Sequence, residues 1–212
     1  MPLFALLPPT LLAGCSFFTR SAPLPQIYVL GAGTAIAADP PADVANLPTL
    51  RLLWPLPAPG LDTERIAVLH PDGRLDYYTG GRWGAPVPEV IAELALATLR
   101  ASGAWRAVGD PRDVFNTDYV LRMAVSRFDA DYGADGAAPT VHVVLQCLLL
   151  RRHDGQPVAN FDAAGTAAAA ANRMGAVVTA FEAAAHSALA AVAAQSAQAV
   201  QNADRPVASM KR

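Results

Sequence analysis

Residues 118–131 read Asp-Tyr-Val-Leu-Arg-Met-Ala-Val-Ser-Arg-Phe-Asp-Ala-Asp and alternate in character along their length. A period of two residues is typical of a β-strand with one buried face. Strict alternation places on one face Tyr119, Leu121, Met123, Val125 and Arg127. It places on the other face Val120, Arg122, Ala124, Ser126 and Phe128. This stretch therefore predicts a long strand, around which the rest of the fold can be arranged.

Two more strands are expected directly after it. Residues 140–152 are mostly apolar and follow the turn-rich segment 132–137, so they are expected to pair with the first strand in antiparallel fashion. A second tight turn, His153–Gln156, leads into residues 157–163. Together the three segments predict an antiparallel meander.

The chain ends in a predicted helix that is rich in alanine, residues 167–203. Its apolar positions recur every three or four residues and form a stripe made of Val178, Phe181, Ala185, Ala188 and Val192. Because most of these side chains are small, whatever packs on the stripe must approach closely. Glu182, His186 and several glutamines make the helix too polar for hydrocarbon, so we expect it to pack on the sheet or on a neighbouring subunit.

The first half of the chain predicts short strands and one helix. The strands are expected over residues 26–30, 48–54, 66–69, 74–78 and 105–108, with 66–69 and 74–78 forming a hairpin across a Pro-Asp-Gly turn. A helix is expected from Pro88 to just before Ser102. Its apolar face comprises Val87, Ile91, Leu94, Ala95 and Thr98 or Leu99. The fold class that results is α/β of the α+β type, a mostly antiparallel mixed sheet with one mid-chain helix and one long C-terminal helix packed on it.

Composition limits the organisation and the partners. The 212 residues fit one folded domain, expected over residues 26–203, with a disordered tail at 204–212. The formal net charge is −2, and no window concentrates lysine or arginine. Nucleic acid is therefore not an expected partner.

The N-terminus carries a processing signal. Leu12, Ala13, Gly14 and Cys15 follow a short apolar run and match a bacterial lipobox, although no lysine or arginine precedes Cys15. Small residues leave the peptide bond before the cysteine accessible, and the thiol can take a diacylglycerol through a thioether. We expect a signal peptide over residues 1–14, a proline-punctuated tether over 15–25, and diacylglycerol plus an N-acyl chain on Cys15. An unprocessed apolar N-terminus is the alternative.

No catalytic constellation or metal site is predicted. Asp129, Asp131 and Asp135 are spaced as in a calcium loop, but Gly133 and Thr140 occupy positions that need ligands, so a solvated hairpin tip is favoured. The four histidines lie in separate segments. Cys147 is expected to be a buried, unreactive thiol. We therefore expect neither an enzyme nor a bound cofactor.

One dense group of aromatic and charged residues stands out. It follows the expected hairpin and contains Asp76, Tyr77, Tyr78, Arg82 and Trp83. Aromatic residues of this kind serve equally in partner contacts and in core packing. Both interpretations remain open for Tyr77, Tyr78, Arg82 and Trp83.

The order of these motifs resembles a known family. After the lipobox and tether come Tyr28-Val29-Leu30, Arg65-Ile66, Pro71-Asp72-Gly73, Arg74 to Tyr78, Arg82 to Pro86, Ser102 to Val108, Asp118 to Leu121 and Phe128. This order is similar to that of the ABC-type transport auxiliary lipoproteins, a family that includes the lipoprotein of the paraquat-inducible Pqi system. The resemblance covers about residues 15–200.

The resemblance implies a place and a role. Members work beside MCE-domain lipid transporters of Gram-negative envelopes, and some assemble into homo-oligomeric rings. It implies a lipid-anchored domain at the periplasmic face of the outer membrane that docks with an MCE protein and, through it, with an ABC permease and ATPase. Such a component would support phospholipid transport without catalysis. The alternative is an envelope lipoprotein that regulates or assembles another machine, such as a cell-wall synthase or a secretin.

Overall fold

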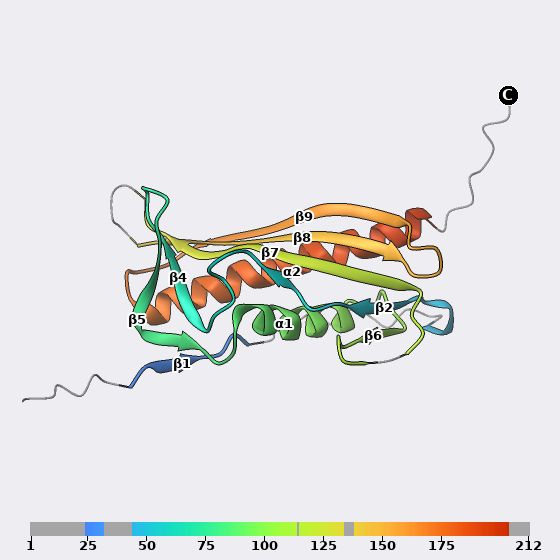
Figure 1. Ribbon diagram of the computed structural model, residues 1–212, viewed down its shortest axis with the longest axis horizontal. Coiled ribbons are helices and arrows are strands. Elements are labelled where there is room, and N and C mark those ends of the chain that lie inside the picture. Colours follow the sequence, from blue (N-terminus) through green and yellow to red (C-terminus); the bar gives the residue numbers. More distant parts are fainter. Residues whose placement is uncertain (1–23, 32–43, 114, 134–137, 204–212) are drawn as a thin grey trace, which may run out of the picture.

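The computed structural model describes residues 24–31, 44–113, 115–133 and 138–203, so the lipobox and the expected tail lie outside the described residues. Its centre is β7, Tyr119–Asp131, the strand that the alternating stretch predicts. One edge of β7 pairs antiparallel along its whole length with β8, Thr140–Arg151. β8 in turn pairs antiparallel with β9, Pro157–Ala168. The predicted meander is confirmed, and it forms the upper layer in Figure 1.

The other edge of β7 is shared by three short parallel strands. β2, Thr49–Leu52, pairs with its first residues; β3, Leu56–Pro57, with its middle; and β4, Arg65–Leu69, with its end. Outside β4 lie β5, Leu75–Trp83, antiparallel, and then β1, Gln26–Tyr28, parallel. Outside β2 lies β6, Ala107–Gly109. A short 3-10 helix, Val44–Asn46, comes just before β2 in the chain. The sheet is mixed, as expected, and its longest ladders are antiparallel.

A β-bulge in β7 changes which residues face the core. The register with β8 shifts between Val125 and Arg127, so that Ser126 has no partner opposite it. An extra residue in one strand reverses the alternation beyond it. Phe128 and Ala130 are therefore fully buried, and Arg127 lies on the opposite face. The strict alternation predicted Arg127 on the face of Val125, and that prediction is wrong beyond the bulge.

The bulge also explains the acidic residues at the end of β7. Arg127 makes two hydrogen bonds to the carboxylate of Asp129, at 3.1 and 2.7 Å, and a third to Asp131 at 3.2 Å. Asp129 is buried, and these hydrogen bonds raise the pKa of Arg127. Asp129 thus belongs to a paired strand and not to a solvated hairpin tip, which corrects the sequence interpretation.

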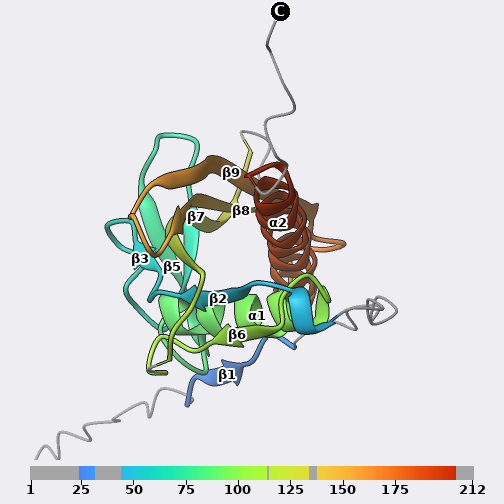
Figure 2. The ribbon, with the colours of Figure 1, turned by 90° about the vertical axis from the view of Figure 1, so that its right-hand side faces the viewer.

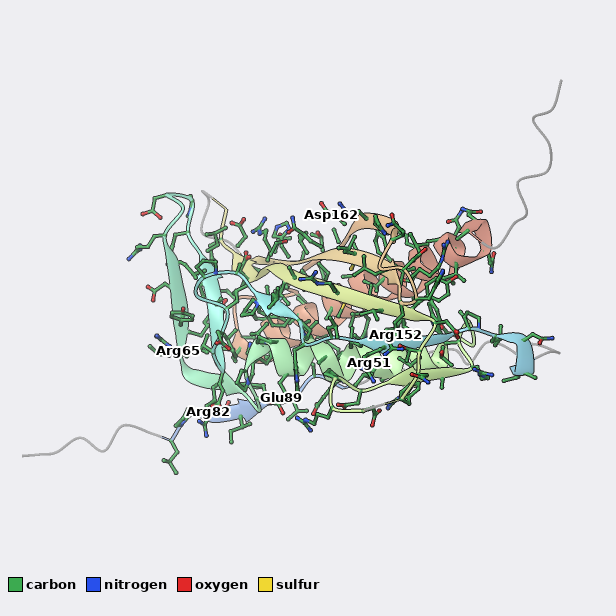
Figure 3. The ribbon with its side chains drawn as sticks, turned by 45° about the vertical axis from the view of Figure 1, so that its right-hand side comes forward. Arg51, Arg65, Arg82, Glu89, Arg152 and Asp162 are labelled. Carbon is green, nitrogen blue, oxygen red and sulfur yellow. The ribbon has the colours of Figure 1, made fainter. Side chains whose placement is uncertain are left out.

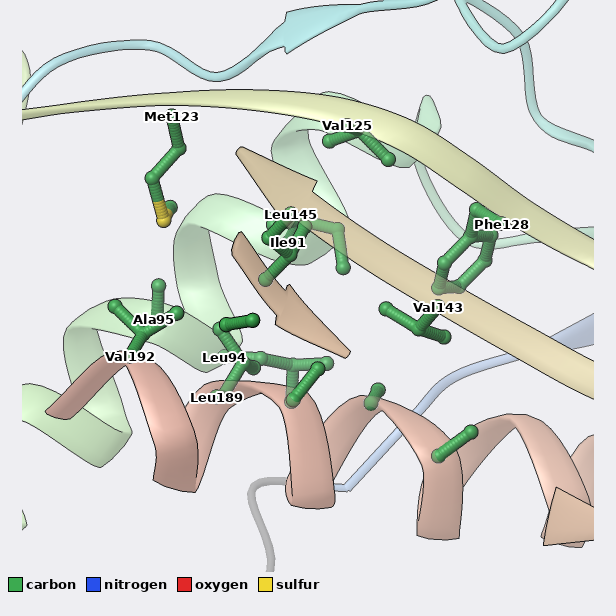
Figure 4. Packing of buried hydrophobic residues seen from close by; sticks show 14 of the residues in the cluster. Ile91, Leu94, Ala95, Met123, Val125, Phe128, Val143, Leu145, Leu189 and Val192 are labelled. Atoms are coloured by element: carbon green, nitrogen blue, oxygen red, sulfur yellow. The ribbon is translucent and has the colours of Figure 1, made fainter. Parts of the chain in front are cut away.

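Two helices enclose the core against the sheet. Helix α1, Val87–Ala101, buries the expected face, and Pro88 lies in its first turn. Helix α2, Met174–Ala203, packs on β9 and β8. Figure 2 shows the two helices on one side of the meander, and Figure 4 shows side chains of both helices meeting those of β7 and β8. The labelled core residues are Ile91, Leu94, Ala95, Met123, Val125, Phe128, Val143, Leu145, Leu189 and Val192.

The α2–β9 contact is as close as the alanine stripe predicts. A β-carbon added at Gly165 would overlap the carbonyl oxygen of Ala184 and lie 2.9 Å from the backbone nitrogen of Ala188. Only glycine allows this approach of backbone to backbone. The stripe differs in one position, because Val177 is buried where Val178 was expected. By length and composition α2 could cross a membrane, but its buried face packs on β9 and β8 of the sheet.

The largest differences from the predicted boundaries lie where β9 is followed by α2 and at the end of β5. The helix expected from residue 167 begins at Met174, because residues up to Ala168 continue β9 opposite β8. Helix propensity is a weak prior, and the pairing with β8 overrides it. β5 runs on from Tyr78 to Trp83. The pairing with β4 is irregular in the middle of β5, where Gly80 has a φ of +80°. Arg82 pairs with Arg65 and Tyr77 with Ala67, so residues 78–81 of β5 lie opposite a single residue of β4, Ile66.

Candidate docking surface

The structure separates the aromatic group of β5 into one core residue and a set of partly exposed ones. Trp83 is only 1 % exposed, and its ring lies edge-on to Phe128 and Phe181, with centroid distances of 5.6 and 5.0 Å. Aromatic pairs in this geometry add stability beyond the area they bury. For Trp83, the core interpretation is therefore the correct one.

Tyr78 belongs to a half-buried hydrogen-bond chain. The Tyr132 hydroxyl donates to Oδ1 of Asn172 at 2.7 Å, so the 2.9 Å bond between the two tyrosines has Tyr78 as its donor. Burial and this bond to Tyr132 raise the pKa of Tyr78. The chain connects β5, the end of β7 and the segment that enters α2. Tyr78 is a structural residue in this arrangement.

Tyr77 and Arg82 lie at the surface. The guanidinium of Arg65 lies 3.8 Å from the centre of the Tyr77 ring, and the Tyr77 hydroxyl donates to the Gly60 carbonyl at 2.9 Å. Arg82 forms an ion pair with Glu64 at 2.8 Å. Figure 3 shows Arg65 and Arg82 at one end of the molecule, away from Arg51 and Arg152. At this end of the molecule, Arg65 thus lies against an aromatic ring, and Arg82 is held by an ion pair.

β1 adds exposed apolar side chains to the same end. Ile27 lies opposite Arg82 in the parallel pairing with β5. Leu24, Ile27 and Val29 are 91, 58 and 78 % exposed, which is unusual for large apolar residues in one short segment. Within the described residues β1 pairs on one side only, so its other edge presents unpaired backbone groups. We call Leu24, Ile27, Val29, Tyr77 and Arg82 the β1–β5 surface.

The sequence pointed to only part of this surface. It singled out Tyr77 and Arg82 as a dense group, but Leu24, Ile27 and Val29 were missed. A short apolar strand gives no sign of whether it will be central or at an edge. The proline-rich segment just before it was the available signal, since a strand that follows a tether tends to lie at the periphery of a domain.

Other residues considered for chemistry are structural. Cys147 is buried in β8, as expected, and burial raises the pKa of its thiol to about 12, which disfavours the reactive thiolate. His186 contacts the Gly31 carbonyl oxygen at 2.8 Å and joins α2 to the segment after β1. Among residues 24–31, 44–113, 115–133 and 138–203 the structure brings together no group of acidic, histidine or cysteine residues that could hold a metal ion.

Comparison with solved structures shows the same fold elsewhere. Protein XCC0632 from Xanthomonas campestris, of family DUF330, matches with a TM-score of 0.73 and 24 % identity, over 85 % of this chain and 100 % of that one. A second, uncharacterized protein matches with a TM-score of 0.62 and 15 % identity, over 84 % and 99 %. A dodecamer of a PelC point variant from Paraburkholderia phytofirmans matches over 68 % of this chain and 86 % of that one, at 21 % identity, but a TM-score of 0.39 does not establish a common fold.

Sequence comparison identifies the family. A search of curated proteins finds no match. The family model of the ABC-type transport auxiliary lipoprotein component matches residues 28–201, from β1 almost to the end of α2. The match covers most of the chain and includes α1, nearly all of α2 and every strand after β1. The chain belongs to the family of ABC-type transport auxiliary lipoprotein components.

Proposed function

We propose that this protein is a lipid-anchored, non-enzymatic docking component of an MCE-type lipid transporter, held at the periplasmic face of the outer membrane through Cys15. The observation that carries the proposal is the β1–β5 surface on a chain of this family. An edge strand with exposed apolar side chains can bind a partner by adding a strand to the sheet. The partner in this proposal is the MCE protein, which links the domain to the permease and the ATPase.

The position of the surface suits an anchored domain. Eight residues lie between Cys15 and Leu24, the first described residue. A fully extended chain advances at most about 3.6 Å per residue, so the tether can hold Leu24, just before β1, no more than about 32 Å from the anchor. Two or more acyl chains give effectively stable attachment. The domain can therefore present β1 to a partner that reaches the membrane.

Co-purification tests the docking role. The native protein, extracted in mild detergent from cells that also produce the MCE subunit, is expected to retain that subunit. A double change, Ile27→Asp with Val29→Asp, should abolish co-purification, because it places charge on the proposed contact. Leu56→Asp is the matched control, since Leu56 is 60 % exposed but lies on β3.

The outcomes separate the alternatives. Absence of the MCE subunit from the wild-type complex would overturn the docking proposal, and recovery of a cell-wall synthase or a secretin instead would support the regulatory alternative. Equal loss in the Leu56→Asp control would show that the contact is not on β1. Circular dichroism establishes that each variant is folded.

The anchor is tested separately. Cys15→Ala should remove palmitate labelling and release the protein from membranes, because no other thiol lies near the processing site. Mass spectrometry should show that the mature protein begins at an acylated Cys15. Unchanged membrane retention of the variant would overturn the anchor and leave the docking proposal to be judged on co-purification alone.

A further inference from the structure

A second surface lies near the C-terminal end of α2, away from β1. It is an open hollow of about 770 Å³. Its walls come from the segment before β2, the starts of β6 and β7, the end of β8 and the last residue of α2. Arg106, Arg151 and Arg152 contribute cations to it, and Asp118 the carboxylate. We call this site the arginine hollow.

The carboxylate of Asp118 in the hollow already has hydrogen-bond partners within the protein. Asp118 accepts hydrogen bonds from the backbone nitrogen of Thr49 at 2.8 Å and from its hydroxyl at 2.7 Å. These bonds lower the pKa of Asp118, and the nearby charge of Arg106 adds to the effect. Asp118 is therefore held as an anion by Thr49 and not by a direct ion pair with an arginine of the hollow.

Two of the arginines lack a carboxylate partner. Arg151 pairs with Asp154 at 3.3 Å. In the part of the chain that the structure describes, neither Arg106 nor Arg152 has a carboxylate within 4.0 Å, and Arg152 donates only to the amide oxygen of Asn116, at 3.3 Å. Both side chains are exposed, and each guanidinium has five N–H donors in a planar fork that matches an oxyanion.

A buried hydroxyl in the wall of the hollow also lacks a partner. Thr117 is only 6 % exposed, and its Oγ1 makes no hydrogen bond to any described residue. Leaving a buried polar group without a hydrogen bond destabilises the folded state. Because Thr117 also lines the polar hollow, an oxygen bound there is a candidate partner for this hydroxyl. This observation is independent of the arginines.

The charge balance favours an anion of low charge. Arg151 is neutralised by its ion pair with Asp154, so Arg106 and Arg152 stand against Asp118 and the C-terminal end of α2, whose dipole is equivalent to about half a negative charge. The sum is positive by about half a charge. We propose that the arginine hollow binds a phosphate group, either the phosphodiester head group of a phospholipid or a free phosphate. Its volume lies within the range of small-molecule sites, about 300–1,000 Å³.

Titration of the purified full-length protein in mild detergent tests the site. Isothermal titration calorimetry would compare inorganic phosphate with dihexanoyl phosphatidylglycerol below its micelle concentration. Binding of either is expected, and tighter binding of the lipid identifies the head group as the source of the phosphate. Tighter binding of inorganic phosphate identifies the free ion. Because no partner protein is present, the result does not depend on the docking proposal.

Substitutions distinguish the site from general charge attraction. Arg106→Gln and Arg152→Gln should each weaken binding about tenfold or more, since a hydrogen bond to a charged group contributes about 1.5–3 kcal/mol. Arg122→Gln is the matched control, because Arg122 is an exposed arginine of β7 that does not line the hollow. Thr117→Val should weaken binding a few-fold, and Thr117→Ser should restore it. No binding to the wild type, or equal loss in the Arg122→Gln control, would overturn the proposal.

Discussion

On the side of β5 and β7, helix α2 presents Phe181, whose ring centroid lies 5.0 Å from that of Trp83 and 4.9 Å from that of Phe128. On the side of β9, one turn further along, the backbone of Ala184 and Ala188 lies against Gly165, with no side chain between them. Large rings set the spacing on the first side, and the absence of a side chain sets it on the second. Removing side-chain atoms should therefore destabilise the first contact, and adding a side-chain atom should destabilise the second.

Removing atoms on the aromatic side should have the largest effect. Trp83→Ala is expected to lower the free energy of unfolding by about 3–5 kcal/mol, because it leaves a cavity between Phe128 and Phe181. Urea denaturation measures the loss. Arg82→Ala, one residue away, removes an exposed ion pair and should cost no more than about 1 kcal/mol. Equal losses in the two variants would contradict the inward orientation of Trp83.

Adding one carbon on the glycine side should have the next largest effect. Gly165→Ala is expected to destabilise the protein by about 1–3 kcal/mol, because the helix must move away from β9. Gly175, within α2, is the control, since a β-carbon there would meet only ordinary contact, 3.7 Å from Arg173. Gly175→Ala should be neutral or stabilise by up to about 1 kcal/mol. A neutral Gly165→Ala would show that α2 does not depend on this approach.

The hydrogen-bond chain beside the aromatic contact should have a smaller effect. Tyr132→Phe removes the hydroxyl that joins Tyr78 to Asn172, and it is expected to cost about 1 kcal/mol. Tyr77→Phe removes an exposed bond to Gly60 and should cost less. Thermal unfolding of the two variants makes the comparison. A larger loss in Tyr77→Phe would show that the hydroxyl of Tyr77, and not that of Tyr132, has the structural role.

A change that touches neither side of α2 should have the smallest effect. Thr49→Val removes the hydrogen bond of the Thr49 hydroxyl to Asp118 and should cost less than about 1 kcal/mol at neutral pH. Because the folded pKa of Asp118 lies below its ordinary value, the wild type gains stability above the ordinary pKa and loses it as the pH falls through the folded one. The variant should therefore lose less stability on acidification.

Carboxyl NMR titration provides the direct measurement for this last change. The pKa of Asp118 should rise toward its ordinary value in Thr49→Val, with the unfolding free energy followed between neutral pH and about pH 3. Asp118→Asn, which removes the titrating group, should show the same reduced acid sensitivity. An unchanged pKa in Thr49→Val would mean that the hydroxyl does not hold the carboxylate.

Local patterns were enough to predict much of this arrangement. The meander, the hairpin of β4 and β5, helix α1 and the close packing of the alanine-rich helix all follow from spacing and turn residues. The bulge at Ser126 does not, because nothing in an alternating sequence marks the residue that is left unpaired. The three short strands along one edge of β7 also depend on pairings between distant segments, which periodicity does not encode.

The surfaces were harder to predict than the fold. Tyr77 and Arg82 were found because they are dense in sequence, while Trp83 in the same run belongs to the core. The arginine hollow brings together residues 106, 117 and 151–152, which come from separate elements and form no run of basic residues. A surface assembled by topology leaves little trace in a linear pattern.

The three-residue ladder between β1 and β5 has a mechanical consequence for an anchored protein. Any tension along the chain that leads to Leu24 would reach the domain through β1, whose register with β5 covers only Gln26, Ile27 and Tyr28. Only the few hydrogen bonds of this short ladder resist a pull along β1. The long ladders of β7 with β8 and of β8 with β9 do not lie between the tether and the domain, so the pull does not act on them first. Under force, β1 would yield first and leave the rest of the domain intact.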